Sequence, residues 1–154
     1  AIGVVRRDPM AMLPFIRYHE GHYLQHWNNL GTNTNTTKLP RIYFVNWFRK
    51  NDQDTFVWPG FGENSRVLEW IIGRIEGTAD ATETPIGYTP TPQSLNTTGL
   101  NITDTDLHTA ITVQTQEWKT EIPLIEDWFT HIGNKVPTAL HTELENLRTR
   151  LENA

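Results

Sequence analysis

Residues 39–48 carry the densest run of β-branched and aromatic side chains in the chain, and this run constrains the fold most strongly. The sequence there, Leu-Pro-Arg-Ile-Tyr-Phe-Val-Asn-Trp-Phe, is almost continuously apolar and predicts a strand buried on both faces. A single strand cannot form a sheet alone. The sheet must therefore include strands that are weak in sequence, or strands from chain outside these 154 residues.

Two shorter segments are candidates for such strands. Residues 1–5 read as the end of a buried strand, and residues 55–58 as a short strand that Pro59 and Gly60 end. A polar turn at 51–54 precedes the second of them, and the prolines within 8–16 predict an irregular connection there. Together these segments predict a small mixed sheet.

Helical spacing of apolar residues appears twice before residue 78. Tyr23, Leu24, Trp27 and Leu30 predict a helix that Gly31 stops, followed by an exposed polar loop at 31–38. A second helix should start at Asn64 or Ser65, because either side chain can cap it, and should end before Gly77. Its expected buried stripe consists of Val67, Leu68, Ile71, Ile72 and Ile75.

The remainder is predicted to be a surface connection followed by helices. Residues 78–102 are rich in Thr and Pro and read as the connection, and residues 104–111 as a short helix. A helix at 116–132 should kink or break at Pro123 and end at Gly133. The last helix should start at Pro137, with one apolar face made of Leu140, Leu144, Leu147 and Leu151. The predicted fold class is α/β, with a small mixed sheet, flanking helices and a mainly helical C-terminal third.

Composition excludes several classes of function. Hydrophobic residues make up 37% and charged residues 20%, which suits a folded domain. No apolar run approaches the ~20 residues that cross a bilayer, and no signal peptide is visible, so we expect a cytoplasmic protein without membrane contact. Because cysteine is absent, a thiol nucleophile and a zinc finger are excluded.

Charge is divided unevenly along the chain. Residues 1–77 hold nine Lys and Arg against seven Asp and Glu, whereas residues 78–154 hold four against eleven. The acidic second half argues against a nucleic-acid partner. An anionic small ligand would fit the first half better.

The chemistry is concentrated between Asn46 and Leu68. Phe48, Phe56 and Phe61 lie on three short elements that can converge, and glycines bracket Phe61. Aromatic rings can hold a purine, and the amide of Asn64 can donate to one group of a guanine edge and accept from the next. Three phenylalanines within 14 residues are more often part of a core, so composition alone leaves both readings open.

Longer motifs carry a family resemblance. Residues 44–50, Phe-Val-Asn-Trp-Phe-Arg-Lys, and residues 56–70, Phe-Val-Trp-Pro-Gly-Phe-Gly-Glu-Asn-Ser-Arg-Val-Leu-Glu-Trp, resemble a signature of the GTP-dependent phosphoenolpyruvate carboxykinases. Residues 7–15, 23–27 and 123–126 are also similar to that family, so the resemblance spans nearly the whole chain. It implies that residues 1–154 are the C-terminal part of the carboxykinase nucleotide-binding domain. We divide them into a base-binding part at 1–77, the connection at 78–102 and a helical part at 103–154.

The resemblance also implies site residues and a reaction. Phe48, Phe56 and Phe61 would contact guanine, Asn64 would read its edge, and Gly62 and Glu63 would act through backbone and loop shape. The family converts oxaloacetate and GTP to phosphoenolpyruvate, CO2 and GDP, a step of gluconeogenesis, with Mn2+ and Mg2+. Its phosphate loop, metal ligands and substrate arginines are expected upstream of Ala1, and nothing here matches Gly-x4-Gly-Lys-Ser/Thr. The expected partners are guanine nucleotide and the remainder of a monomeric carboxykinase chain.

Two other functions remain open on the residues alone. The chain would then be a non-catalytic guanine-nucleotide-binding or regulatory module, or a structural helical domain whose aromatic residues form the core. Burial of the three phenylalanines separates the last reading from the others.

Several further motifs have simpler explanations than a function. His19, His22 and His26 would share a helix face and could hold a metal, but a solvated face explains them better. Sequons begin at Asn35, Asn96 and Asn101, and they fit a Thr-rich composition. The carboxylate pairs Glu126/Asp127 and Glu143/Glu145 read as solvated helix faces rather than acid–base pairs.

Overall fold

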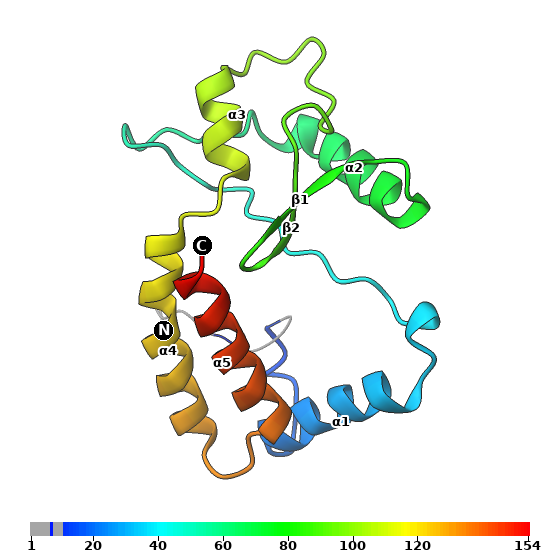
Figure 1. The fold of residues 1–154 in the computed structure, drawn as a ribbon, viewed down its shortest axis with the longest axis vertical. Coiled ribbons are helices and arrows are strands. Elements are labelled where there is room, and N and C mark those ends of the chain that lie inside the picture. The colour runs from blue at the N-terminus through cyan, green and yellow to red at the C-terminus, as the bar shows by residue number, and fades with distance from the viewer. Residues whose placement is uncertain (1–6, 8–10) are drawn as a thin grey trace. The chain divides into compact units, whose positions relative to one another are not determined.

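The structure is a computed structural model that describes residue 7 and residues 11–154 (Figure 1). The predicted strand end at 1–5 lies outside the described residues, as does the first part of the predicted irregular connection. Residues 11–16 of that connection are irregular, as expected. The chain divides into two compact units, one made of residues 1–39 and 115–154 and the other of residues 40–114.

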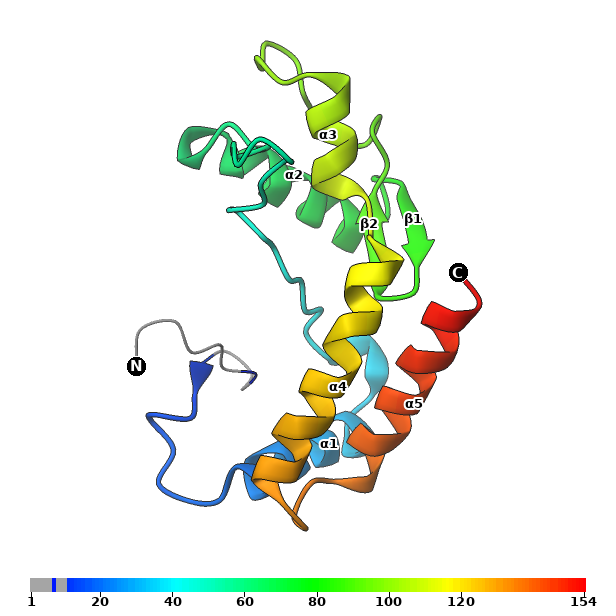
Figure 2. The same cartoon turned by 90° about the vertical axis from the view of Figure 1, so that its left-hand side faces the viewer.

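The first unit is helical in its described part. It contains α1 (Glu20–Asn33), a single turn η2 (Thr36–Lys38), α4 (Thr115–Ile132) and α5 (Thr138–Glu152). Helices α4 and α5 lie side by side (Figures 1 and 2). Ile122 from α4 packs with Leu144 and Leu151 from α5, and Leu151 is only 1% exposed. The predicted apolar face of the last helix is therefore confirmed at these positions.

Two predicted helix boundaries in this unit were wrong, and α4 does not break where a break was one of the expectations. Helix α1 continues through Gly31 to Asn33, because a glycine costs a helix only about 1 kcal/mol relative to alanine. The predicted 31–38 loop is consequently short and includes the η2 turn. Helix α4 continues through Pro123, so the helix does not break there, and the neighbouring Ile122 packs against α5. Helix α5 begins at Thr138, with Pro137 at the N-cap rather than inside the first turn.

The second unit holds the sheet and two helices. It contains η3 (Phe61–Glu63), α2 (Asn64–Glu76), β1 (Ala81–Thr84), β2 (Gly87–Pro90) and α3 (Asp104–Ile111). Strands β1 and β2 form an antiparallel hairpin in which Ala81 pairs with Pro90 and Thr84 with Gly87. Trp70 from α2 packs with Leu95 and Leu107 to form the core.

The predicted α/β class and the helical last third are confirmed, but the sheet is in a different place. Residues 39–48 form no strand: residues 47–48 lie in a turn, and the side chains of Ile42 and Phe44 are 57% and 93% exposed. No described residue pairs with this backbone, so the ladder a strand needs is absent. Residues 55–58 likewise form only an isolated bridge between Lys50 and Phe56. The hairpin instead lies within the predicted 78–102 connection.

Helix α2 starts at Asn64 and ends at a left-handed Gly77, as predicted. Of its predicted buried stripe, Ile71 packs against the core, but the prediction was wrong for three residues. Leu68, Ile72 and Ile75 are each more than half exposed, whereas Trp70 and Gly73 are buried. Trp70 meets the ring of Tyr43 edge to face, with ring centroids 6.1 Å apart. The absent side chain of Gly73 allows Ala79 to approach, since a Cβ there would lie 2.8 Å from the Ala79 Cβ.

Candidate functional site

A short loop between Phe48 and Phe56 brings these two rings together. The backbone N–H of Asn51 donates to the Thr55 oxygen at 2.9 Å, and that of Val57 donates to the Arg49 oxygen at 3.0 Å. The Phe48 and Phe56 rings then meet edge to face, with centroids 6.1 Å apart. Both remain open to solvent, at 74% and 54% exposure. This aromatic pair is therefore exposed to solvent rather than buried in a core.

The base of this loop is attached to α3. Arg49 Nη1 donates to the Thr112 carbonyl oxygen at 2.7 Å, just beyond the end of the helix. Asn51 Nδ2 donates to Asp106 Oδ1 at 3.4 Å. The neighbouring Val57 is buried at 3% exposure. The exposed rings consequently project from a backbone that is held in place.

Phe61 is displayed separately in the η3 turn and is 93% exposed. Gly60 precedes it with φ of 113°, a conformation that a side chain would strain, so glycine is required for this turn. A Cβ at Gly62 would meet no atom within 4 Å. Within the described residues Phe61 makes no ring contact with Phe48 or Phe56, so two of the three predicted rings are in contact.

Asn64 is the first residue of α2 and does not cap it, contrary to the sequence prediction. The N-cap is Glu63, without a side-chain cap. The side chain of Asn64 is instead occupied by Trp58, whose indole Nε1 donates to Asn64 Oδ1 at 3.1 Å. Trp58 is 7% exposed. A buried tryptophan thus holds one end of the amide that was predicted to read a base.

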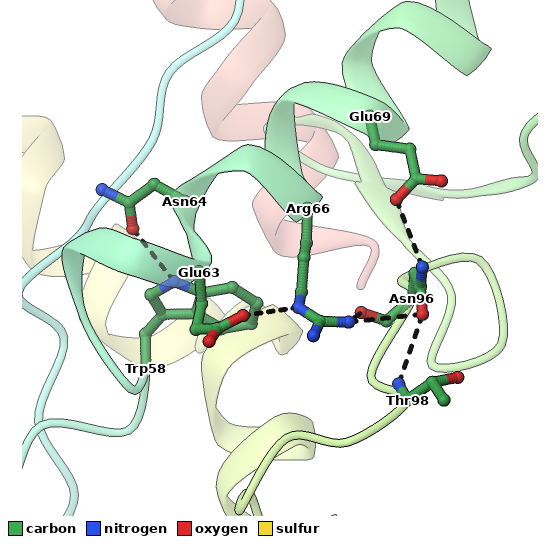
Figure 3. A network of polar contacts seen from close by, with 7 residues as sticks. All are labelled: Trp58, Glu63, Asn64, Arg66, Glu69, Asn96 and Thr98. Carbon is green, nitrogen blue, oxygen red and sulfur yellow. Dashed lines mark hydrogen bonds and ion pairs between the residues drawn. The ribbon is translucent and has the colours of Figure 1, made fainter.

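Glu63 belongs to a polar network that ties the start of α2 to a neighbouring loop (Figure 3). Its Oε2 accepts from Arg66 Nε at 2.6 Å, and Arg66 Nη1 donates to the backbone oxygen of Asn96 at 2.8 Å. Asn96 Oδ1 also accepts from the backbone N–H of Thr98 at 3.2 Å. The Glu63 carboxylate is therefore held by an arginine of its own unit, which fixes the turn that carries Phe61.

Three residues of this arrangement were not predicted as site residues: Trp58, Arg66 and Asn96. Trp58 and Arg66 lie inside the signature segment, so their position was the available signal. Asn96 was noted only as the start of a sequon, and nothing in its local sequence indicates a contact with residues 30 positions earlier. Long-range polar contacts of this kind have no periodic pattern.

Two residues of this network, Arg66 and Asn96, also line a pocket of about 180 Å³. It is lined by Arg66, Glu69, Trp70, Gly73, Thr78, Ala79, Ser94 and Asn96. None of the six predicted site residues lines this pocket. The predicted residues instead lie on the Phe48–Phe56 loop and in the turn at the start of α2, with the three phenylalanines exposed.

The histidines of α1 have other roles in the described structure. His19 Nδ1 accepts from the backbone N–H of Gly21 at 3.1 Å and so caps the helix. His22 Nε2 lies 3.2 Å from Lys135 Nζ. Among residue 7 and residues 11–154, no group of three or more His, Asp or Glu side chains could hold a metal ion. The described residues therefore do not fit a divalent-metal site.

The carboxylates of the last two helices are engaged by arginines. Arg148 Nη2 contacts Glu126 Oε1 at 2.6 Å, and Arg150 Nη2 contacts Glu143 Oε1 at 2.8 Å. The hydrogen bond from Arg150 holds the pKa of Glu143 below its ordinary value. Glu126 and Glu143 therefore form ion pairs with arginines of α5. In the described part, no helix has the length and apolar character that crossing a bilayer requires.

Known proteins match this chain over nearly its full length. Residues 1–150 match the family model described as the phosphoenolpyruvate carboxykinase C-terminal P-loop domain. The chain is 54% identical over 151 residues to the phosphoenolpyruvate carboxykinase [GTP] of Paenarthrobacter aurescens, and 53% identical over 151 residues to that of Renibacterium salmoninarum. Each alignment covers 98% of this chain and 25% of the relative.

A more distant relative shows the same coverage. The phosphoenolpyruvate carboxykinase [GTP] of Corynebacterium jeikeium is 47% identical over 154 residues, which is 100% of this chain and 25% of the relative. The chain thus spans about a quarter of the length of the curated relatives it matches. It belongs to the GTP-dependent phosphoenolpyruvate carboxykinase family, in which it corresponds to a C-terminal portion.

Proposed function

We propose that this chain supplies the guanine-holding surface of a GTP-dependent phosphoenolpyruvate carboxykinase. The complete protein would convert oxaloacetate and GTP to phosphoenolpyruvate, CO2 and GDP. Phe48, Phe56 and Phe61 contact the base in this proposal, and Asn64 reads its edge. Gly62 and Glu63 contribute the backbone and the shape of the turn.

The exposure of the three phenylalanines carries the proposal. Each is more than half exposed, and Phe61 is 93% exposed. Burying apolar surface is worth about 25 cal/mol per Å², so a phenylalanine left in water forgoes a gain that a core position would provide. Large exposed aromatic side chains are typical of a ligand surface. This exposure argues against reading the three rings as core.

Phosphate and metal binding are assigned to the rest of the carboxykinase polypeptide. No Gly-x4-Gly-Lys-Ser/Thr motif occurs in residues 1–154, and the described residues do not fit a metal site. The Mn2+ and Mg2+ of the reaction would be held elsewhere, and we derive no chemical step through them. The 154 residues alone should bind guanine nucleotide weakly and show no turnover, and measurable carboxykinase turnover would contradict this division.

We further propose that the complete protein is a cytoplasmic monomer. Sedimentation of the full-length protein should give a single species at the mass of one chain. Localisation of a tagged full-length protein by cell fractionation would check the cytoplasmic assignment.

The decisive test is Asn64→Ala in a full-length carboxykinase that carries these residues. We expect the variant to lose activity with GTP by about tenfold or more in kcat/KM, the cost of one lost hydrogen bond to a base edge, with little change for ATP. Comparison with inosine triphosphate, which lacks the exocyclic amine, separates reading of that amine from reading of the 6-oxo group.

The matched control is Asn101→Ala, an exposed asparagine on another segment. It should leave the activity with both nucleotides unchanged. Equal losses for GTP and ATP in the Asn64→Ala variant would end the edge-reading role. Tight GDP binding by the 154 residues alone would favour the non-catalytic module instead.

A further inference from the structure

The side-chain amide of Asn64 accepts a hydrogen bond at its oxygen from a residue of the same unit, and its nitrogen is unpaired among the described residues. Trp58 Nε1 lies 3.1 Å from Asn64 Oδ1 (Figure 3). An indole N–H can only donate, so its partner must be the amide oxygen and not the amide nitrogen. The orientation of the amide, which is often ambiguous, is therefore set here by the chemistry of its partner.

The nitrogen end of the amide points away from the indole (Figure 3). Within the described part of the chain, Asn64 Nδ2 has no hydrogen-bond partner. Its two N–H groups are therefore unpaired and can meet a ligand, while the oxygen already accepts from the indole. A group that presents donors pairs with an acceptor, such as the 6-oxo group of guanine or hypoxanthine, and opposes the 6-amino group of adenine.

Trp58 is suited to hold this orientation. It is 7% exposed, and its neighbour Val57 is 3% exposed, so the indole has little freedom to move. Asn64 itself is at the first position of α2, where the helix fixes its backbone. The Glu63–Arg66–Asn96 network holds the same turn from the other side. Both partners of the hydrogen bond are thus anchored.

We propose that Trp58 is a positioning residue that sets purine preference by holding Asn64 with its N–H groups toward the base; this inference rests on the proposed function. Without the indole N–H, the amide can turn over and offer its oxygen. An oxygen accepts from the 6-amino group of adenine, so the preference for 6-oxo purines should weaken. Trp58 touches no nucleotide in this scheme and acts only through Asn64.

The test is Trp58→Phe in a full-length carboxykinase that carries these residues, because phenylalanine keeps an aromatic ring and removes the N–H. We expect the ratio of kcat/KM for GTP to that for ATP to fall by about tenfold, the effect of losing one orienting hydrogen bond. The loss should appear in the KM for GTP, with kcat at saturating GTP unchanged. GTP and inosine triphosphate should behave alike, since both carry the 6-oxo group.

Trp70→Phe is the matched control. Trp70 is also buried, at 5% exposure, and its Nε1 donates to the Asp80 backbone oxygen at 3.0 Å. This variant loses an equivalent hydrogen bond and a similar volume without touching Asn64, so the GTP-to-ATP ratio should stay within about twofold of the parent. A fall as large as that of Trp58→Phe would show a general loss of packing and would overturn the positioning role.

Comparing Asn64→Ala, Trp58→Phe and the double variant distinguishes failure of this inference from failure of the proposed function. If Asn64→Ala leaves the GTP-to-ATP ratio unchanged, the proposed function fails. If Asn64→Ala lowers the ratio and Trp58→Phe does not, only the positioning role fails. When both single variants lower the ratio, Trp58→Phe should add nothing to Asn64→Ala, as expected for residues that act as a unit.

A second measurement does not require the Trp58 variant to fold. In full-length protein labelled with 15N at the tryptophan indoles, Asn64→Ala should move the indole N–H resonance of one tryptophan. The same resonance should move when GDP binds to the parent protein. Absence of an indole resonance that responds to both changes would overturn the proposal.

Discussion

Helices α2 and α5 both carry an apolar stripe, but α5 buries the centre of its stripe, whereas most of the α2 stripe is exposed. In α5, Leu144 and Leu151 are 7% and 1% exposed because Ile122 of α4 packs against them. In α2, Leu68, Ile72 and Ile75 are 53%, 54% and 55% exposed. The periodicity is equally clear in both sequences. Periodicity therefore identifies residues on one face of a helix, whereas burial of that face depends on a packing partner.

The largest expected effect tests this difference directly. Leu151→Ala should lower the free energy of unfolding by about 2–5 kcal/mol, because it leaves a cavity in a packed cluster. Ile72→Ala, on the exposed face of α2, should cost no more than about 0.5 kcal/mol. Urea denaturation of the 154-residue chain followed by circular dichroism measures both. Equal losses of unfolding free energy in the two variants would contradict the difference in burial between α5 and α2.

A glycine substitution tests which face of α2 is packed. Gly73→Ala should destabilise the chain by about 1–3 kcal/mol, because the new Cβ would lie 2.8 Å from the Ala79 Cβ. The control is Gly31→Ala near the end of α1, where a Cβ would meet no atom within 4 Å. Removing a helical glycine there should stabilise the chain by up to about 1 kcal/mol. Thermal denaturation of both variants checks the signs, and a neutral Gly73→Ala would contradict the packing described.

The smallest effect concerns the surface of α5 and its dependence on pH. The hydrogen bond from Arg150 holds the pKa of Glu143 below its ordinary value of 4.5. A folded-state pKa below the unfolded value stabilises the fold above pH 4.5, and this stabilisation is lost as the pH falls through the folded-state pKa. The group is solvent-screened, so its contribution is small.

Glu143→Gln should therefore be slightly less stable than the parent at pH 7. The difference should shrink as the pH falls below 4.5, which denaturation at several pH values would detect. Glu152→Gln, close to the end of the same helix, is the control. A gap that persisted at acid pH would show that the glutamate acts through something other than its charge.

Local signals in the sequence predicted the helices well. The spacing of the leucines located α5, and Asn64 and Gly77 marked the two ends of α2. The α3 boundaries were also predicted, and the structure shows that Thr103 caps this helix. These elements depend on contacts within a few residues.

Features that depend on distant partners were not predictable in the same way. The 39–48 segment has the composition of a buried strand, yet no described residue supplies a neighbouring strand. The β1–β2 hairpin has a composition that reads as a loop, yet its β-branched threonines pair in register. Within the candidate site, the aromatic residues and Asn64 were noticed from the residues alone, and the family resemblance supplied their roles together with Gly62 and Glu63. The Trp58 contact to Asn64 needed the structure, because a hydrogen bond over six positions has no sequence signature.

The extended 40–45 segment has a practical consequence for handling the isolated chain. No backbone hydrogen bond of these residues is present in the described structure, and Ile42 and Phe44 are exposed. Unpaired amides beside apolar side chains are a template for strand pairing between copies. We expect the purified 154 residues to self-associate as their concentration rises. A lysine in place of Phe44, at the most exposed apolar position of that edge, should keep preparations monodisperse for light scattering.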